Sequence, residues 1–339
     1  MKAVGLYQYL PAEDENSFQD VDIEKPEAVG RDLLVEVKAI SVNPVDTKIR
    51  APKEKTEKQP RILGWDAAGT VVAVGEQVTQ FKPGDDVYYA GDVTRPGTNS
   101  EFHLIDERIV GHKPKTLSFS EAAALPLTSI TAWEGLFDRL NISRTGEDAG
   151  KSILIIGGAG GVGSIAIQIA KKVAKLNVIA TASRPETIAW CKKQGADVIV
   201  NHRNNLAEEV EQAGYKFVDY IFCLNDTDGH WETMTQAIKP QGIICSIVET
   251  EQPIALRPLM SKSANFVWEF MFTRSMYQTD DMEEQHHLLN DISHLMDSQV
   301  LQTTYTDVVR PINAQNLRSV HARIEKGNTI GKIVLADWN

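Results

Sequence analysis

The stretch that decides the fold lies near the middle of the chain: Lys151-Ser-Ile-Leu-Ile-Ile156, then Gly157-Gly-Ala-Gly-Gly-Val-Gly163, then Ser164-Ile-Ala-Ile-Gln-Ile-Ala-Lys171. The pattern predicts a buried strand, a glycine turn and an amphipathic helix in immediate succession. This order directs the unpaired N–H groups at the start of the helix toward whatever lies above the turn, and a pyrophosphate is the usual occupant. The segment therefore predicts a nucleotide-binding unit.

Three glycines of the turn, Gly158, Gly160 and Gly163, have the spacing of a dinucleotide-binding fingerprint. One makes the tight turn, one lets a phosphate approach the backbone, and one lets the helix pack closely on the strand. A merely structural turn is the alternative, but the strand before it and the helix after it favour nucleotide binding. The predicted cradle is the whole turn: Gly158, Ala159, Gly160, Gly161, Val162 and Gly163.

Strand and helix patterns alternate from residue 151 onward. Alternation of this kind implies right-handed crossovers and a parallel sheet covered on both faces. The sequence thus predicts an α/β protein with a Rossmann doubly wound parallel sheet. The strand candidates are 152–156, 177–182, 197–200, 217–224 and 243–248, and the helix candidates between them are 185–195 and 230–239.

The first ~125 residues have a different pattern. Short β-rich runs at 33–40, 69–75 and 86–90 are separated by glycine and proline turns, which suggests a partly open antiparallel barrel. In the last ~65 residues the pattern predicts helices and a closing strand, so we expect the nucleotide unit to be inserted in a β-rich domain. The predicted domains are 1–125 with 275–339 for the β-rich domain and 126–274 for the Rossmann domain.

Composition limits the classes of function. The net charge of −11 over 339 residues argues against a nucleic-acid surface, which needs a basic field. Three isolated cysteines are too few for a disulfide framework and suit a reducing compartment. No signal peptide and no apolar stretch of the ~20 residues that span a bilayer are visible. We therefore expect a cytoplasmic protein that binds neither nucleic acid nor membrane.

Six motifs in a fixed order resemble the medium-chain dehydrogenase/reductase superfamily over essentially the whole length. The branch with the strongest resemblance is the quinone-oxidoreductase-like proteins, many of which are labelled zinc-type alcohol dehydrogenase-like. The resemblance implies a GroES-like amino-terminal domain, a Rossmann domain, a nicotinamide in the cleft between them, and a homodimer. The motifs are the glycine turn, Asn43-Pro-Val-Asp46, Leu63-Gly-Trp-Asp-Ala-Ala-Gly69, Lys82-Pro-Gly-Asp85, Leu125-Pro-Leu-Thr-Ser-Ile-Thr-Ala132 and Gly331-Lys-Ile-Val334.

Zinc-dependent members hold their catalytic metal with a cysteine, a histidine and a second cysteine or an acid. Matched motif to motif, these positions are Asn43, Trp65 and Leu127 here. A catalytic zinc needs three nitrogen, sulfur or carboxylate ligands, and an amide, an indole and an isobutyl group do not supply them. The stretch 90–97, where relatives begin a four-cysteine lobe, contains no cysteine. The sequence predicts no metal site.

The choice of dinucleotide depends on the end of the second strand. NAD-binding units place an acid about 20 residues past the glycines, and this chain has Ser183 and Arg184 there. A guanidinium would bind the 2′-phosphate of NADPH, whereas an acid would repel it. His202 and Arg203 end the third strand, where relatives often carry a tyrosine. These four residues are predicted to bind NADPH, and a solvated loop is the alternative.

Three further residues complete the predicted cofactor-binding set. Cys223 and Val248 end the fourth and fifth strands, and ligands lie beyond the carboxyl ends of strands in such folds. Lys332, in the last of the six motifs, is also assigned to the cofactor.

Without a metal, hydride donation to an electron-poor alkene or quinone is the least demanding chemistry, because the nicotinamide supplies the hydride and the protein orients the rings. The predicted function is an NADPH-dependent reduction of quinones or α,β-unsaturated carbonyls. Asn43 would donate to the substrate carbonyl, Trp65 would stack on a flat substrate, and Thr131 would contact the nicotinamide. Structural roles in a turn or in core packing are the alternatives.

Two other functions remain open at this point. A zinc-type alcohol or aldehyde dehydrogenase would need the missing ligands, and a non-catalytic NADPH-binding redox sensor would need no catalytic residues. The aromatic run Phe266-Val-Trp-Glu-Phe-Met-Phe272 alternates like a strand with large residues on one face. Relatives use this segment as an edge strand for dimer pairing, so we expect a homodimer through the Rossmann edge strand.

Overall fold

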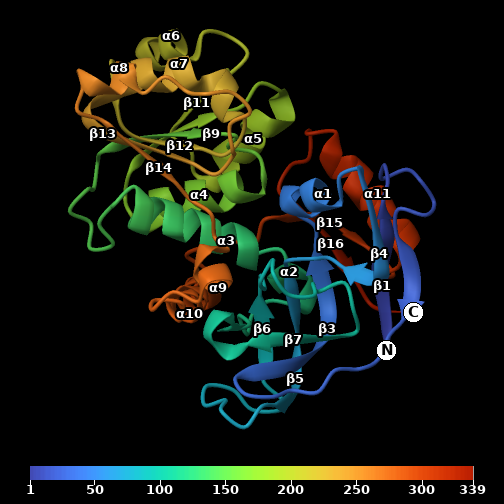
Figure 1. Ribbon diagram of the computed structural model, residues 1–339. Coiled ribbons are helices and arrows are strands. Elements are labelled where there is room, and N and C mark those ends of the chain that lie inside the picture. Colours follow the sequence, from blue (N-terminus) through green and yellow to red (C-terminus); the bar gives the residue numbers. More distant parts are fainter. Residues whose placement is uncertain (339) are drawn as a thin grey trace. The chain divides into compact units, whose positions relative to one another are not determined.

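The computed structural model describes residues 1–338, which form two compact units (Figure 1). One unit runs from Thr131 to Met271; the other comprises Met1–Ile130 and the chain from Phe272 onward. We call them the parallel-sheet unit and the β-rich unit. The sequence predicted domain boundaries after residues 125 and 274, close to these positions. Which of the two units binds a cofactor stays a prediction.

The parallel-sheet unit contains one six-stranded sheet in the order β11-β10-β9-β12-β13-β14. Every neighbouring pair is parallel. The order reverses between β9 and β12, as in a doubly wound nucleotide-binding sheet, so the predicted fold class is confirmed. The strands are β9 (Ser152–Ile156), β10 (Asn177–Thr181), β11 (Val198–Val200), β12 (Val218–Cys223), β13 (Ile238–Ser246) and β14 (Asn265–Trp268).

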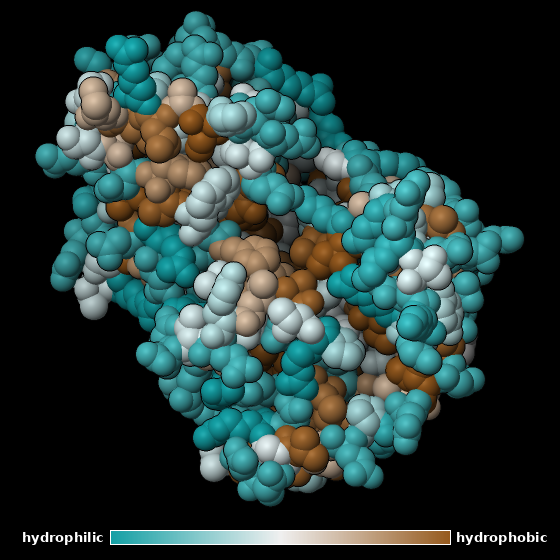
Figure 2. Space-filling model, in the orientation of Figure 1, coloured by the Kyte–Doolittle hydropathy of each residue, from teal (hydrophilic) through white to brown (hydrophobic). Residues whose placement is uncertain are grey.

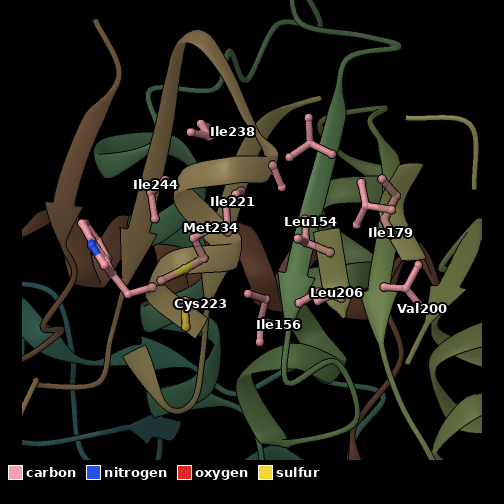
Figure 3. Packing of buried hydrophobic residues seen from close by; sticks show 14 of the residues in the cluster. Leu154, Ile156, Ile179, Val200, Leu206, Ile221, Cys223, Met234, Ile238 and Ile244 are labelled. Carbon is pink, nitrogen blue, oxygen red and sulfur yellow. The ribbon is translucent and has the colours of Figure 1, made fainter. Parts of the chain in front are cut away.

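Helices cover this sheet, and the apolar side chains between them form the core. On one face, Leu154 of β9, Ile221 of β12 and Ile244 of β13 belong to one buried cluster with Met234 from α7 (Figure 3). In α4, all eight residues from Gly163 to Ala170 are buried, so this helix is enclosed rather than amphipathic at the surface. The helices are α4 (Gly161–Lys172), α5 (Pro185–Gln194), α6 (Leu206–Gln212), α7 (Thr227–Ala237) and α8 (Arg257–Met260).

The β-rich unit holds a seven-stranded sheet in the order β15-β16-β3-β5-β6-β8, with β7 paired to β3, and a three-stranded sheet β2-β1-β4. All pairs are antiparallel except β15–β16. The strands are β1 (Lys2–Tyr9), β2 (Gln19–Asp22), β3 (Asp32–Ser41), β4 (Lys53–Ile62), β5 (Ala67–Val74), β6 (Asp86–Tyr89), β7 (Phe102–Asp106), β8 (Gly111–His112), β15 (Tyr305–Val309) and β16 (Lys332–Ala336).

The helices of the β-rich unit include α1, which starts directly after Asn43, and α3, whose last residues cross into the parallel-sheet unit. None of the helices among residues 1–338 combines the length and apolar character that a bilayer crossing requires. The helices are α1 (Pro44–Arg50), α2 (Phe119–Ala123), α3 (Pro126–Trp133), α9 (Thr273–Tyr277), α10 (Glu284–Asp297) and α11 (Ala314–Glu325).

The structure corrects one predicted element. The aromatic run 266–272 is a strand only as far as Trp268, where β14 ends. Met276 N donates to Phe272 O, so the chain has already begun α9 at the end of the run. The alternation of large side chains in the sequence extends to Phe272, although the backbone stops pairing with β13 at Trp268.

Candidate functional site

The glycine turn between β9 and α4 has the geometry of a phosphate cradle. Gly157 has φ of +89° and its N–H donates to Thr181 Oγ1 over 2.9 Å, which fixes the turn against β10. A Cβ on Gly163 would lie 2.3 Å from Gly157 O, so only glycine lets α4 approach the strand this closely. The predicted packing role of Gly163 thus has a steric basis.

Gly160 caps the amino end of α4. A Cβ there would meet only Gly157 O, at 3.5 Å, so the space above the start of the helix is open to a ligand. Ala159, Gly161 and Val162 are partly exposed around it. The first N–H groups of a helix lack intrahelical partners, and with the positive end of the helix dipole they favour an anion. The residues present therefore fit the pyrophosphate of a dinucleotide.

The predicted 2′-phosphate residues follow two neighbouring parallel strands, so they leave the same edge of the sheet. Ser183 and Arg184 follow β10, and Arg184 Nε lies 3.2 Å from Glu186 Oε1. His202 and Arg203 follow β11. Burial, and next the electrostatic influence of His230 and Arg203, lower the pKa of His202. Its buried Nδ1 atom has no hydrogen-bond partner within residues 1–338.

Cys223 is the last residue of β12, whereas Val248 lies beyond the end of β13 at Ser246, so the predicted strand 243–248 is too long. Both residues are held by neighbouring groups. The Cys223 thiol donates to Asn225 O over 3.0 Å, and burial raises its pKa to about 11, so it is not a reactive thiolate at neutral pH. The carbonyl of Val248 accepts from Thr227 Oγ1 at 2.5 Å. The Asn225 side chain lies against the glycine turn, since a Cβ on Gly157 would be 2.8 Å from its Oδ1. Sequence reasoning missed the contact between Asn225 and the turn.

In the β-rich unit, a buried hub joins Asn43, Asp66 and Lys332. Lys332 Nζ lies 3.0 Å from Asp66 Oδ2 and 3.2 Å from Val42 O, and it also donates to Asn43 Oδ1. The Asn43 amide donates to Asp66 Oδ2 over 2.8 Å and to Trp65 O over 3.4 Å. Both amide hydrogens of Asn43 thus have protein acceptors, and the Lys332 ammonium group is bound by protein oxygens.

Asp66 ties this hub to two more segments. Its Oδ1 atom accepts the backbone N–H of Leu127 at 2.8 Å, at the start of α3. Its Oδ2 atom also accepts from Ser41 Oγ at 2.9 Å, at the end of β3. Asp66 was not among the predicted site residues. Its position next to Trp65 in the Leu63–Gly69 motif was the only available signal.

Asp46 lies beside the hub at the start of α1. Its carboxylate accepts the Asn43 N–H over 2.7 Å in a capping box. Complete burial raises the pKa of Asp46 to about 7, although the Asn43 N–H and Lys332 act in the opposite direction. The hub therefore has a second carboxyl group that can hold a proton near neutral pH.

The three positions that correspond to zinc ligands do not fit a metal. Asn43 is engaged in the hub, Leu127 offers no ligand atom, and Trp65 donates its indole N–H to Asp92 O over 3.2 Å. The Trp65 ring also packs edge-on against Phe272, with the ring centroids 6.2 Å apart. Among residues 1–338, no three His, Cys, Asp or Glu side chains form a group that would hold a metal ion.

Thr131, the third predicted catalytic residue, is buried in α3. One turn further along the chain, in the π-helical segment Glu134–Arg139, is a carboxyl pair that the sequence did not predict. The carboxyl groups of Glu134 and Glu269 are in hydrogen-bond contact and both are buried. Arg139 Nε donates to Glu269 Oε2 over 2.8 Å. Burial, and next the charge of Glu134, raise the pKa of Glu269 well above its ordinary value.

Comparison with known proteins identifies the family. Residues 30–131 match the family described as Alcohol dehydrogenase GroES-like domain, and residues 161–287 match Zinc-binding dehydrogenase. The chain is 46% identical over 336 residues to the Zinc-type alcohol dehydrogenase-like protein SAS2087 of Staphylococcus aureus (strain MSSA476), which covers 99% of both chains. This chain belongs to the medium-chain dehydrogenase/reductase superfamily. The predicted resemblance is confirmed, and the protein is an oxidoreductase of that superfamily.

Other members of the superfamily resemble it over shorter stretches or at lower identity. The 2-methylene-furan-3-one reductase of Solanum lycopersicum is 36% identical over 245 residues, covering 69% of this chain and 59% of that protein. The quinone oxidoreductase of Escherichia coli, solved in complex with NADPH, superposes with a TM-score of 0.83 at 26% identity and covers 99% of this chain and 100% of that one.

Proposed function

We propose that this superfamily member is an NADPH-dependent reductase of quinones or α,β-unsaturated carbonyls that works without a catalytic zinc ion. The observation that carries the proposal is the hub: the motif positions that would bind zinc hold Asn43, Trp65 and Leu127. The Asn43 amide and the Leu127 N–H donate hydrogen bonds to the Asp66 carboxylate, and the Trp65 indole N–H donates to Asp92 O. An alcohol dehydrogenase would need a Lewis acid or another base there to acidify the alcohol.

The proposed preference for NADPH over NADH rests on residues that follow two neighbouring strands of the parallel sheet. Ser183 and Arg184 stand where NAD-binding units carry an acid. The Arg184 guanidinium is partly exposed, and Glu186, with which it forms an ion pair, is itself exposed, so a phosphate can compete for it. His202 and Arg203 add hydrogen-bonding capacity and charge at the next strand. The E. coli quinone oxidoreductase, which is 26% identical, was solved in complex with NADPH.

When bound, the nicotinamide supplies the hydride, and the residues of this chain bind and orient the reactants. In the proposal, the cradle from Gly158 to Gly163 holds the pyrophosphate, and Cys223 and Val248 border the groove for the nicotinamide half. Thr131 contacts the ring or its ribose. Orientation of the two reacting atoms at ~3–3.5 Å is the main contribution required of the protein, and water supplies the final proton.

In the proposal, the residues that form the substrate site belong to the β-rich unit. The Trp65 ring is 1% exposed, donates its N–H to Asp92 O and packs on Phe272, so in this proposal it shapes the floor of the substrate site from beneath and does not stack on the substrate. Because both Asn43 amide hydrogens are already used, we assign Asn43 and Lys332 to positioning rather than to direct substrate or cofactor contact. This is a revision of their predicted roles.

The test is NADPH oxidation, followed by absorbance, with 9,10-phenanthrenequinone and with a short-chain enal as acceptors. We expect turnover with at least one acceptor, unchanged after exhaustive chelation, and a protein preparation free of stoichiometric zinc. Turnover that is lost on chelation and restored by zinc would contradict the proposal. Tight NADPH binding without turnover of any acceptor would instead favour a redox sensor.

A further inference from the structure

The surroundings of the Lys332 ammonium group resemble a cation-binding site. Three oxygen atoms of different kinds surround Nζ: the carboxylate of Asp66, the carbonyl of Val42 and the amide oxygen of Asn43. An ammonium group has three N–H donors and no acceptor, so each donor has one oxygen partner. Lys332 is 3% exposed and Asp66 is 0% exposed.

This group joins segments that are far apart in the sequence. Val42 and Asn43 follow β3, Asp66 precedes β5, and Lys332 begins β16. The Leu127 N–H, at the start of α3, is bound to the other oxygen of Asp66. The segments around 43, 65 and 127 are those from which zinc-dependent relatives take their metal ligands. In this chain they are joined through one carboxylate and one ammonium group.

The charges in the hub require this cation. A buried carboxylate without a partner is strongly unfavourable, and removing one partner of a buried ion pair is far more damaging than replacing both. Ser41 Oγ, Asn43 Nδ2 and the Leu127 N–H also donate to Asp66, but they are neutral groups. Lys332 supplies the positive charge that is in direct contact with this carboxylate.

We infer that Lys332 is a fixed internal cation that replaces the metal as the link between these segments and closes the site to zinc. This inference deepens the proposed zinc-free function. Lys332 is then a positioning residue: it holds Asn43 and, through Asp66, the segment that carries Trp65 and the start of α3. An ordinary buried ion pair would also stabilise the fold. A cation site has the additional property of accepting a different cation when the lysine side chain is removed.

The experiment is chemical rescue of Lys332→Ala, measured by thermal unfolding without cofactor or substrate. The substitution removes three methylene groups and the ammonium group, which n-propylammonium matches in size and charge. We expect the Tm to fall by about 5–15 °C and millimolar n-propylammonium chloride to restore a third or more of that loss, saturably. Equal concentrations of n-propanol or sodium chloride should restore none of it.

A matched control uses Lys239, which pairs with Asp219 in the parallel-sheet unit with its side chain 37% exposed. In Lys239→Ala, n-propylammonium should have no more effect than sodium chloride. A folded Lys332→Ala variant that is not rescued, or that is rescued equally by n-propanol, would overturn the inference.

If Lys332→Ala does not fold, the variants Lys332→Met and Lys332→Met/Asp66→Asn decide the matter. We expect the double variant to unfold at a higher temperature than the single one, because the carboxylate in direct contact with Lys332 is then no longer left buried without its cation. A double variant that is no more stable than the single one overturns the inference. Since neither measurement uses NADPH or an acceptor, failure here is distinct from failure of the reductase assay.

Discussion

At the scale of single residues, Arg184 carries the proposed preference for NADPH. Its guanidinium would make a charge-assisted contact with the 2′-phosphate of about 1.5–3 kcal/mol. We expect Arg184→Ala to raise the Kd for NADPH about 10- to 100-fold and to change the Kd for NADH by less than about twofold, as measured by fluorescence titration. Glu186→Gln should tighten NADPH binding slightly, because Glu186 competes for the same guanidinium.

Arg144 provides the control for that experiment. It forms an ion pair with Asp138 over 3.1 Å and is also partly exposed, but it lies outside the predicted cofactor groove. Arg144→Ala should leave both dissociation constants unchanged. Equal weakening of NADPH and NADH by Arg184→Ala would contradict the assignment.

Single residues also show where sequence reasoning reached its limit. The motif positions Asn43, Trp65 and Leu127 were enough to predict that zinc ligands are missing. What occupies the site instead depended on Asp66 and Lys332, which are separated by 266 positions in the chain. Local sequence pattern does not reveal a pairing between residues so far apart in the chain. Lys332 was therefore predicted to bind the cofactor.

At the scale of helices and strands, the sequence pattern predicted the bounds of an element best where the strand is fully buried. The predicted strand 152–156 coincides with β9, and the predicted helix 185–195 ends one residue beyond α5. By contrast, β4 (Lys53–Ile62) was not predicted. Its sequence, Lys-Glu-Lys-Thr-Glu-Lys-Gln-Pro-Arg-Ile, has no apolar alternation, since it is an exposed edge strand paired only with β1. Pairing with a partner strand overrides a poor intrinsic preference.

The π-helical segment and the residue after β14 are joined by the buried carboxyl pair Glu134–Glu269. This pair predicts that the stability of the fold depends on pH. The raised pKa of Glu269 means that the folded protein keeps a proton that the unfolded chain loses above its ordinary pKa of 4.5. Stability is therefore lost as the pH rises from about 4.5 toward the raised pKa. Each pH unit in that window costs about 1.4 kcal/mol, roughly 2–4 °C in Tm.

We expect Glu134→Gln to reduce this loss, because its amide can donate to an ionised Glu269 that remains paired with Arg139. The measurement is the Tm from pH 5 to pH 9 for wild type and variant. Glu211→Gln, at an exposed position on α6, is the control and should follow the wild type. Parallel curves for wild type and Glu134→Gln would show that the pair does not hold the extra proton.

At the scale of the whole molecule, β14 predicts how two copies associate. It is the last strand of the six-stranded sheet, with pairing to β13 on one side. Trp268 and Phe270 are 45% and 47% exposed, and apolar surface gathers over the region of β13 and β14 (Figure 2). An exposed apolar edge strand is a template for pairing with another chain. Antiparallel pairing of β14 with a second copy would continue the sheet and bury these rings.

We expect the wild-type protein to be a dimer at tens of micromolar in sedimentation or light-scattering experiments. Trp268→Glu should shift it to monomer, because the substitution places a charge where a dry apolar contact would form. Val29→Glu, which changes an exposed apolar residue of the β-rich unit, should leave the dimer intact. A monomeric wild type, or a Trp268→Glu variant that remains dimeric, would exclude this edge as the interface. Because Trp268 precedes Glu269 directly, an unchanged pH dependence of Tm in Trp268→Glu would show that association and the carboxyl pair are independent.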